Sequence, residues 1–262
     1  MVSFTSGELD ALLAQFFWPF ARILALTLTA PIFAERVLPL RMRIGLAVLL
    51  AAIVAPTLPA PPAVHPVSLA GVVILAQQLV IGAALGFAMR LVFVAVETAG
   101  ELAGLQMGLG YATLFDPERS DMLPLLGQFL GLLATLAFLA LNGHLHVIQV
   151  LIDTFAALPV SDRALHGAGL LTLASWGAQV FTAGVLLCLP LLGAMLIANL
   201  ALGILTRAAP QLNLFAVGFP LTLGVGLIIL ALMLPLLAPQ FVRLYGEGFA
   251  AMAEIAGGLQ GR

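Results

Sequence analysis

The stretch AGLLTLASWGAQVFTAGVLLCLPLLGAMLIANLALGIL, residues 168–205, contains no aspartate, glutamate, lysine or arginine. A helix needs about 20 apolar residues to cross the hydrocarbon core of a bilayer. This stretch is therefore long enough for a membrane span, with Pro190 as the expected kink. Working outward, similar apolar segments occupy residues 11–34, 44–55, 67–90, 122–141 and 212–238. We predict an all-α integral membrane protein with about six long apolar helices, forming a single domain over residues 1–262.

The composition supports a membrane protein and excludes several classes of function. The chain has 262 residues, of which 62% are hydrophobic and 8% charged, whereas soluble domains carry about 25% charged residues. It contains no lysine, so a Walker A phosphate loop and a lysine Schiff base are excluded. The net charge of −2 gives no basic surface for nucleic acid. Because no GxSxG or HExxH motif is present, we expect no enzymatic activity and no cofactor.

A glycine repeat marks the segment 97–121 as unlike ordinary membrane helix. Gly100, Gly104 and Gly108 recur every four residues. Such spacing lets another helix backbone approach closely, and that helix belongs either to this chain or to a partner subunit.

Two carboxylates share one face of the same segment. Glu97 and Glu101 are four residues apart, which places them one helical turn from each other. Two carboxylates inside a membrane helix are typical of a proton relay or a cation site. The alternative is that they face water, or pair with Arg90, near a helix end.

Beyond Gly110 the helical pattern ends in an apolar loop. Tyr111, Leu114 and Phe115 are large and apolar, yet they precede Asp116 and Pro117. An apolar loop is poorly suited to a water-exposed surface, so we expect it to be wedged into a cavity or pore.

Two further stretches predict helix breaks. Asn142, Gly143 and His144 are typical of a turn whose histidines cap helix ends. Two histidines spaced two apart do not share a helix face well and a metal would need more ligands, so we expect no metal site. Pro210 should end a helix, with Gln211 and Asn213 bonding the backbone groups exposed there. The next motif is Gly218-Phe219-Pro220, whose proline disturbs the start of the last helix.

Together these stretches resemble the FliR family of flagellar type III export-gate proteins. The resemblance covers nearly the whole chain in the right order and depends on four motifs. These are ER-LP-R-R (Glu35, Arg36, Leu38, Pro39, Arg41, Arg43), GLQMGLGYATLFDP (104–117), LNGHLHVIQVLIDTFAALP (141–159) and RAAPQLNLFAVGFPLTLGVGL (207–227). The GFP form of the 218–220 motif favours the flagellar branch over the injectisome branch.

The resemblance implies helical hairpins packed like those of FliP and FliQ. It implies a hetero-oligomeric export gate in the bacterial inner membrane, within the flagellar basal body. FliP-like and FliQ-like proteins are the expected partners, with the export-gate proteins FlhB and FlhA. Rod, hook and filament subunits would pass through the channel, and much of the apolar helix would be buried by partners rather than by lipid.

By position, residues 106–121 match the family's plug loop, which helps close the resting channel. The implied plug residues are Met107, Tyr111, Leu114, Phe115, Asp116 and Pro117. The family often has phenylalanine where Tyr111 and Leu114 stand, so Leu114 departs from the pattern, and Phe115 beside it can compensate.

Three hypotheses follow for the function. The first is a non-enzymatic channel component with the loop 106–121 as plug. The second is a stand-alone secondary transporter with Glu97 and Glu101 as its ion-coupling site. The third is a scaffold for gate assembly that has no gating role.

Overall fold

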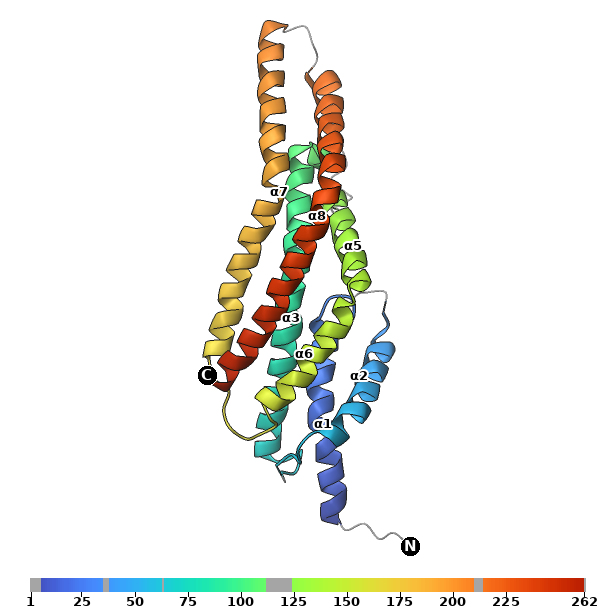
Figure 1. Ribbon diagram of the computed structural model, residues 1–262, viewed down its shortest axis with the longest axis vertical. Helices are drawn as coiled ribbons and strands as arrows, with labels where there is room; N and C mark the ends of the chain where they lie inside the picture. The colour runs from blue at the N-terminus through green and yellow to red at the C-terminus, as the bar shows by residue number, and fades with distance from the viewer. Residues whose placement is uncertain (1–5, 35–37, 63, 112–123, 210–213, 262) are drawn as a thin grey trace. The chain divides into compact units, whose positions relative to one another are not determined.

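The computed structural model describes residues 6–34, 38–62, 64–111, 124–209 and 214–261. Within these ranges every regular element is a helix (Figure 1), which confirms the all-α prediction. The α-helices are α1 (Ser6–Thr29), α2 (Leu40–Val54), α3 (Leu69–Gln106), α5 (Leu125–Ala140), α6 (Gly143–Ala157), α7 (Ala168–Ala208) and α8 (Leu214–Gln260), and the short 3₁₀ helices are η1 (Ala55–Thr57) and η2 (Leu109–Tyr111).

Several helices are long and apolar enough to cross a membrane. Four candidate spans are found among the described residues, at Leu40–Thr57, Leu69–Gln106, Ala168–Ala208 and Gly218–Gln260. The number rises to five if α5 and α6 form one broken span. The predicted figure of about six is thus approximate, and the membrane class is supported.

Two helices continue past the ends that the charge pattern predicts. α3 extends beyond Arg90 to Gln106, and α8 continues through Pro239 to Gln260. The reason in α3 is that Arg90, Glu97 and Glu101 are all exposed, so the helix can carry charges on its outer face without ending. In α8 each of the three internal prolines, Pro220, Pro235 and Pro239, removes one backbone hydrogen bond, and the helix continues through all of them.

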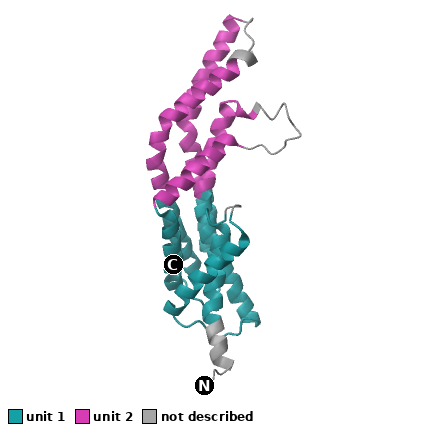
Figure 2. Ribbon diagram, turned by 90° about the vertical axis from the view of Figure 1, so that its right-hand side faces the viewer, with its two compact units in different colours: residues 1–91, 142–178, 245–262 teal, residues 92–141, 179–244 magenta. Residues whose placement is uncertain are grey.

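The chain divides into two compact units, coloured separately in Figure 2. Unit 1 comprises residues 1–91, 142–178 and 245–262, and unit 2 comprises residues 92–141 and 179–244. α3, α7 and α8 each contribute residues to both units. The single-domain organisation stays a prediction.

Unit 1 is built by close packing of α1 on α3. Trp18 and Leu26 of α1 and Leu85 of α3 are fully or almost fully buried. Gly82 and Gly86 of α3 lie directly against the backbone of Arg22 and the side chain of Thr29, where a methyl group would have no room. The two helices can therefore approach more closely than side chains normally allow.

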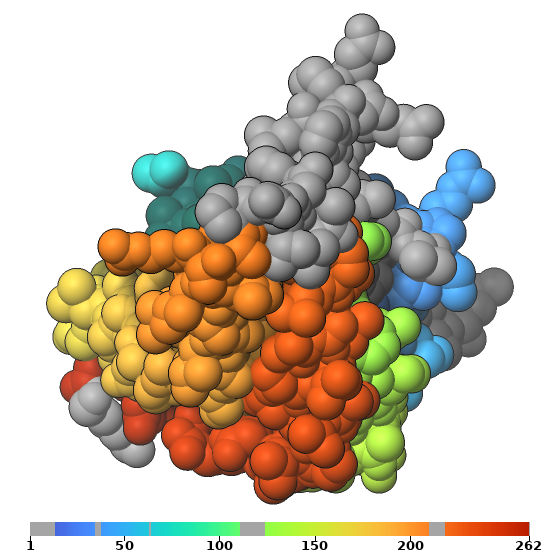
Figure 3. Space-filling view, turned by 90° about the horizontal axis from the view of Figure 1, so that it is seen from above, coloured from blue at the N-terminus to red at the C-terminus, as the bar shows by residue number. Residues whose placement is uncertain are grey.

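Unit 2 packs α3, α5, α7 and α8 side by side, and α8 lies between α7 and α5 in Figures 1 and 3. Phe93 of α3 meets Phe138 of α5 edge to face, with ring centroids 5.3 Å apart. On α7, a Cβ atom at Gly184 would lie 2.8 Å from the carbonyl oxygen of Ala95. Aromatic pairing and small residues together set the helix spacing in this unit.

Candidate channel-plug site at the end of α3

The predicted glycine stripe does not act as a single surface. At Gly100 a Cβ atom would lie 2.6 Å from the carbonyl oxygen of Leu126 and 2.7 Å from Cα of Gly127, so α3 and α5 touch backbone to backbone. At Gly104 the nearest atom would be Leu126 Cβ at 3.5 Å, an ordinary contact. Close approach therefore depends on Gly100, and it is made within this chain.

Gly108 has a different role, because it ends the helix. Its φ of 85° lies in the left-handed region, which glycine adopts without a steric penalty. Its amide donates to the carbonyl of Leu105 at 3.1 Å. This is the usual glycine position just past a helix C-terminus, so Gly108 lies outside the helical stripe.

Met107, the first of the predicted plug residues, is completely buried. Its amide donates to the carbonyl of Ala103 at 3.0 Å, and its own carbonyl lies 3.5 Å from the hydroxyl of Thr222 on α8. Its side chain lies against Gly226, where a Cβ atom would be 2.5 Å from Met107 Cγ. The start of the predicted plug segment 106–121 is thus in contact with α8.

The remaining plug residues are only partly within the described chain. Tyr111 ends the 3₁₀ helix η2. Leu114, Phe115, Asp116 and Pro117 lie outside the described residues.

The two predicted carboxylates both lie on the outer face of α3. Glu97 and Glu101 are exposed, and a Cβ atom at Gly131 of α5 would lie 3.0 Å from Glu97 Cγ and 3.2 Å from its Oε1. Intramembrane ion-coupling carboxylates typically face a bundle interior or a water-filled cavity. The Glu97 side chain lies next to α5, and the role of the two carboxylates stays a prediction.

The Asn142-Gly143-His144 motif forms the break between α5 and α6. Asn142 has a φ of 56°, and its carbonyl accepts the amide of Leu145 at 2.9 Å as α6 begins. Asparagine is among the few residues that adopt this left-handed conformation readily. Gly143 is buried and His144 is half-buried, and the Nδ1 atom of His144 has no hydrogen-bond partner among the described residues. No group of three or more metal-ligating side chains occurs in the described ranges.

Of the second predicted helix break, residues 210–220, the structure describes only the part from residue 214 onward. Pro210, Gln211 and Asn213 lie outside the described residues. Gly218 is buried in α8, whereas Phe219 and Pro220 are exposed on the same helix. Pro220 therefore lies inside the helix, close to its start.

Sequence reasoning missed the polar centre of unit 1. Arg22 has no solvent exposure, and its Nε donates to Gln78 Oε1 at 2.9 Å. Its two terminal nitrogens donate to the carbonyls of Thr154 and Leu158 at 3.1 and 2.8 Å, and its Cζ lies 4.2 Å from the centroid of the Phe155 ring. The available signal was a single charge within the apolar segment 11–34, since such a charge needs buried partners.

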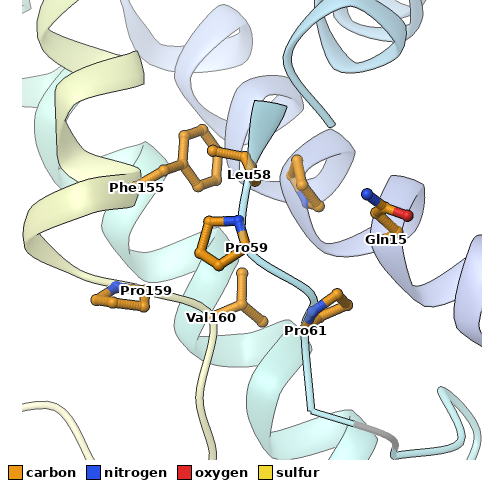
Figure 4. A pocket seen from close by; sticks show the side chains of 8 residues that line it. Gln15, Leu58, Pro59, Pro61, Phe155, Pro159 and Val160 are labelled. Atoms are coloured by element: carbon orange, nitrogen blue, oxygen red, sulfur yellow. The ribbon is translucent and has the colours of Figure 1, made fainter. Parts of the chain in front are cut away.

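A small pocket shares Phe155 with this arginine and lies between α1, the connector from α2 to α3 and the end of α6 (Figure 4). Gln15 is its polar residue, and its Nε2 donates to the carbonyl of Ala55 at 3.2 Å. The lining residues are Gln15, Pro19, Leu58, Pro59, Pro61, Phe155, Pro159 and Val160. With apolar walls and no charged group, the pocket offers packing space rather than chemistry.

Long apolar helices, close glycine contacts and a buried, hydrogen-bonded arginine are the features of a polytopic α-helical membrane protein. Residues 13–248 match the family described as bacterial export proteins, family 1. The chain belongs to this family, that of the flagellar protein FliR.

Three relatives illustrate the range of similarity, and each is called flagellar biosynthetic protein FliR. The chain is 47% identical to that of Pectobacterium carotovorum subsp. carotovorum over 97% of both chains. It is 45% identical to that of Escherichia coli strain K12, again over 97% of both. Identity to that of Bacillus subtilis strain 168 is 32%, over 84% of this chain and 85% of the relative. Because the matches run almost end to end, the resemblance inferred from the sequence is confirmed for the whole chain.

Proposed function

We propose that this chain is a non-enzymatic component of the flagellar type III export gate in the bacterial inner membrane. With FliP-like and FliQ-like proteins it lines the channel for rod, hook and filament subunits, next to FlhB-like and FlhA-like proteins. The segment 106–121 serves as the plug of the resting channel. The observation that carries this proposal is the similarity, over 84–97% of this chain, to the flagellar biosynthetic protein FliR of three bacteria.

The exposed apolar faces of α7 and α8 are evidence for contact with partner subunits. Within unit 2 these helices cover residues 179–208 and 214–244, each about 45 Å at ~1.5 Å per residue. The hydrocarbon core of a bilayer is only about 30 Å thick. Large apolar side chains are nevertheless exposed along both helices, among them Phe181, Leu196, Ile197, Leu200, Ile204, Leu227, Ile228, Leu232 and Leu236. Neighbouring proteins can cover the part of each apolar helix that extends beyond the hydrocarbon core of the bilayer.

The buried C-terminal end of α3 is the structural argument for the plug. Met107 is fixed by α8, and Gly108 turns the chain out of the helix. The loop therefore starts from an ordered point, and its next residues include the apolar Tyr111, Leu114 and Phe115. Apolar side chains in a narrow channel exclude water and ions, because hydration of the constriction is unfavourable.

Co-purification tests the assembly. The tagged chain is co-expressed with the host's FliP-like and FliQ-like proteins, extracted in mild detergent and weighed as an intact complex. A defined particle with all three proteins supports the gate. A monomer or homo-oligomer without either partner would contradict it.

Deletion of residues 110–115 tests the plug in the same complex. Ion leakage through proteoliposomes should rise above that of the wild-type complex. Leakage that stays at the wild-type level, in a complex that still assembles, would favour a scaffold without gating.

A secondary transporter is the second candidate, because Glu97 and Glu101 lie on the candidate span α3. That function requires uptake by the isolated chain in liposomes, abolished by neutralising either glutamate. Their position on an exposed face gives this candidate less support than the gate.

A further inference from the structure

Gly226 of α8 forms a notch that is filled by the side chain of Met107. A Cβ atom at Gly226 would lie 2.5, 2.8 and 2.9 Å from Met107 Cγ, Cε and Sδ. Because Met107 is 0% exposed, its side chain has no solvent-filled space into which to rotate. Any larger residue at position 226 must therefore displace Met107.

A second contact on the same face of α8 reaches the same residue. Thr222 lies one helical turn before Gly226, and its hydroxyl is 3.5 Å from the Met107 carbonyl. The Thr222 hydroxyl makes its shorter bond, 3.0 Å, to the Phe219 carbonyl of its own helix. The side chain of Met107 is thus seated in this face of α8, and its backbone lies in contact with the same face. The next residue, Gly108, leaves the helix with a φ of 85°.

A neighbouring glycine shows that the notch is specific. At Gly224, two residues earlier on α8, a Cβ atom would meet nothing within 4 Å. Gly224 and Gly226 therefore share one helix and one residue type, but only Gly226 touches the end of α3.

We propose that Gly226 is a positioning residue that seats Met107 and so determines how tightly the resting channel excludes ions. The inference depends on the proposed function, in which the segment after Met107 blocks the channel. Gly226 has no contact with ions or substrate in this role, because it acts through Met107. A larger residue at position 226 displaces Met107, the residue from which the plug segment continues. Truncation of Met107 leaves the notch empty and so loosens the start of that segment.

The experiment uses the complex with the FliP-like and FliQ-like proteins, reconstituted in liposomes that are loaded with potassium. Potassium efflux is compared for the wild type, Gly226→Ala, Gly224→Ala, Met107→Ala and the double variant Met107→Ala/Gly226→Ala. Gly226→Ala should raise efflux about tenfold, the factor that corresponds to ~1.4 kcal/mol. Gly224→Ala should leak like the wild type, because its methyl group enters open space.

The double variant separates positioning from a general loss of stability. Removing the Met107 side chain makes room for the new methyl group, so the double variant should leak less than Gly226→Ala alone. Non-additivity of this kind is expected only for residues that act on each other. Efflux equal to the product of the two single effects would overturn the inference.

The deletion of residues 110–115 distinguishes failure of the inference from failure of the plug. If the deletion leaks and Gly226→Ala does not, the inference is wrong and the plug remains. If neither leaks, both are wrong. If Gly226→Ala blocks assembly, recovery in the double variant supports the inference, and no recovery overturns it.

Discussion

Arg22 of α1 donates a hydrogen bond of 2.8 Å to the carbonyl of Leu158, the residue that caps α6. The same guanidinium reaches the Thr154 carbonyl one turn earlier, and all acceptors used by these bonds are neutral. Carbonyls at a helix C-terminus carry partial negative charge, so they compensate a buried cation. One arginine thereby connects α1, α3 and α6 within unit 1.

Replacing Arg22 by methionine should destabilise the chain. Methionine retains the apolar stem but leaves the Leu158 carbonyl and Gln78 Oε1 without this donor, at about 1–3 kcal/mol for each buried unsatisfied group. The Thr154 carbonyl keeps the amide of Leu158 at 2.7 Å. The stability of Arg22→Lys should fall between those of the wild type and Arg22→Met, because a lysine amine cannot reproduce the planar fork of hydrogen-bond donors. Thermal unfolding of the purified chain in detergent measures the effect.

The exposed Arg41 is the matched control for this variant. Arg41→Met should change the free energy of unfolding by no more than about 0.5 kcal/mol, as surface substitutions usually do. Equal unfolding temperatures for Arg22→Met and Arg41→Met would show that the network around Arg22 contributes nothing to stability.

The sequence was sufficient for the helical membrane class, because charge and proline patterns are properties of the chain alone. It was insufficient for Arg22, whose partners lie 56 to 136 residues away along the chain. Nor could spacing show that α8 continues through Pro239, since tolerance of a proline depends on the packing around it.

The candidate site was predicted only in part, because its contacts also join residues that are far apart in the sequence. The glycine spacing at 100, 104 and 108 indicated close packing, but only the packed structure distinguishes the three positions. Met107 was identified from family resemblance, and Gly226 lies within the 207–227 motif, but nothing in the sequence indicates that the two residues touch. Contacts between residues more than a hundred positions apart are set by tertiary packing, which no local pattern reports.

Gly100→Ala should destabilise unit 2, because the new methyl group would lie 2.6 Å from a backbone oxygen of α5. Backbone atoms cannot rotate away as a side chain can, and overpacking of this kind costs about 1–3 kcal/mol. Unfolding temperature in detergent is the measurement.

Gly104→Ala provides the comparison on the same helix. Its methyl group would make ordinary contact with Leu126 at 3.5 Å. Alanine is favoured over glycine in a helix by about 0.5–1 kcal/mol, so this variant should be neutral or more stable. A loss of stability equal to that of Gly100→Ala would mean that the stripe acts as one surface.

The break between α5 and α6 gives a prediction about backbone conformation. Asn142→Gly should keep the stability of the chain, because glycine adopts the observed φ of 56° freely. Asn142→Val should lower it, since the left-handed conformation costs about 1–2 kcal/mol for an ordinary residue and more for a β-branched one. Thermal unfolding compares the two, and similar values for both variants would contradict the assigned conformation.

Two leucines of α8 test whether its apolar face is covered by protein or by lipid. Leu230 is 8% exposed and Leu232 is 72% exposed. Leu230→Ala should lower the stability of the isolated chain by about 2–5 kcal/mol, the usual effect of truncating a buried leucine. Leu232→Ala should leave the isolated chain unchanged and reduce the amount of FliP-like and FliQ-like protein that co-purifies with it, because an interface loses packing there. Lipid tails adapt to the smaller side chain, whereas a protein partner leaves a cavity. Undiminished partner recovery with Leu232→Ala, alongside a destabilised Leu230→Ala, would therefore assign this face of α8 to lipid.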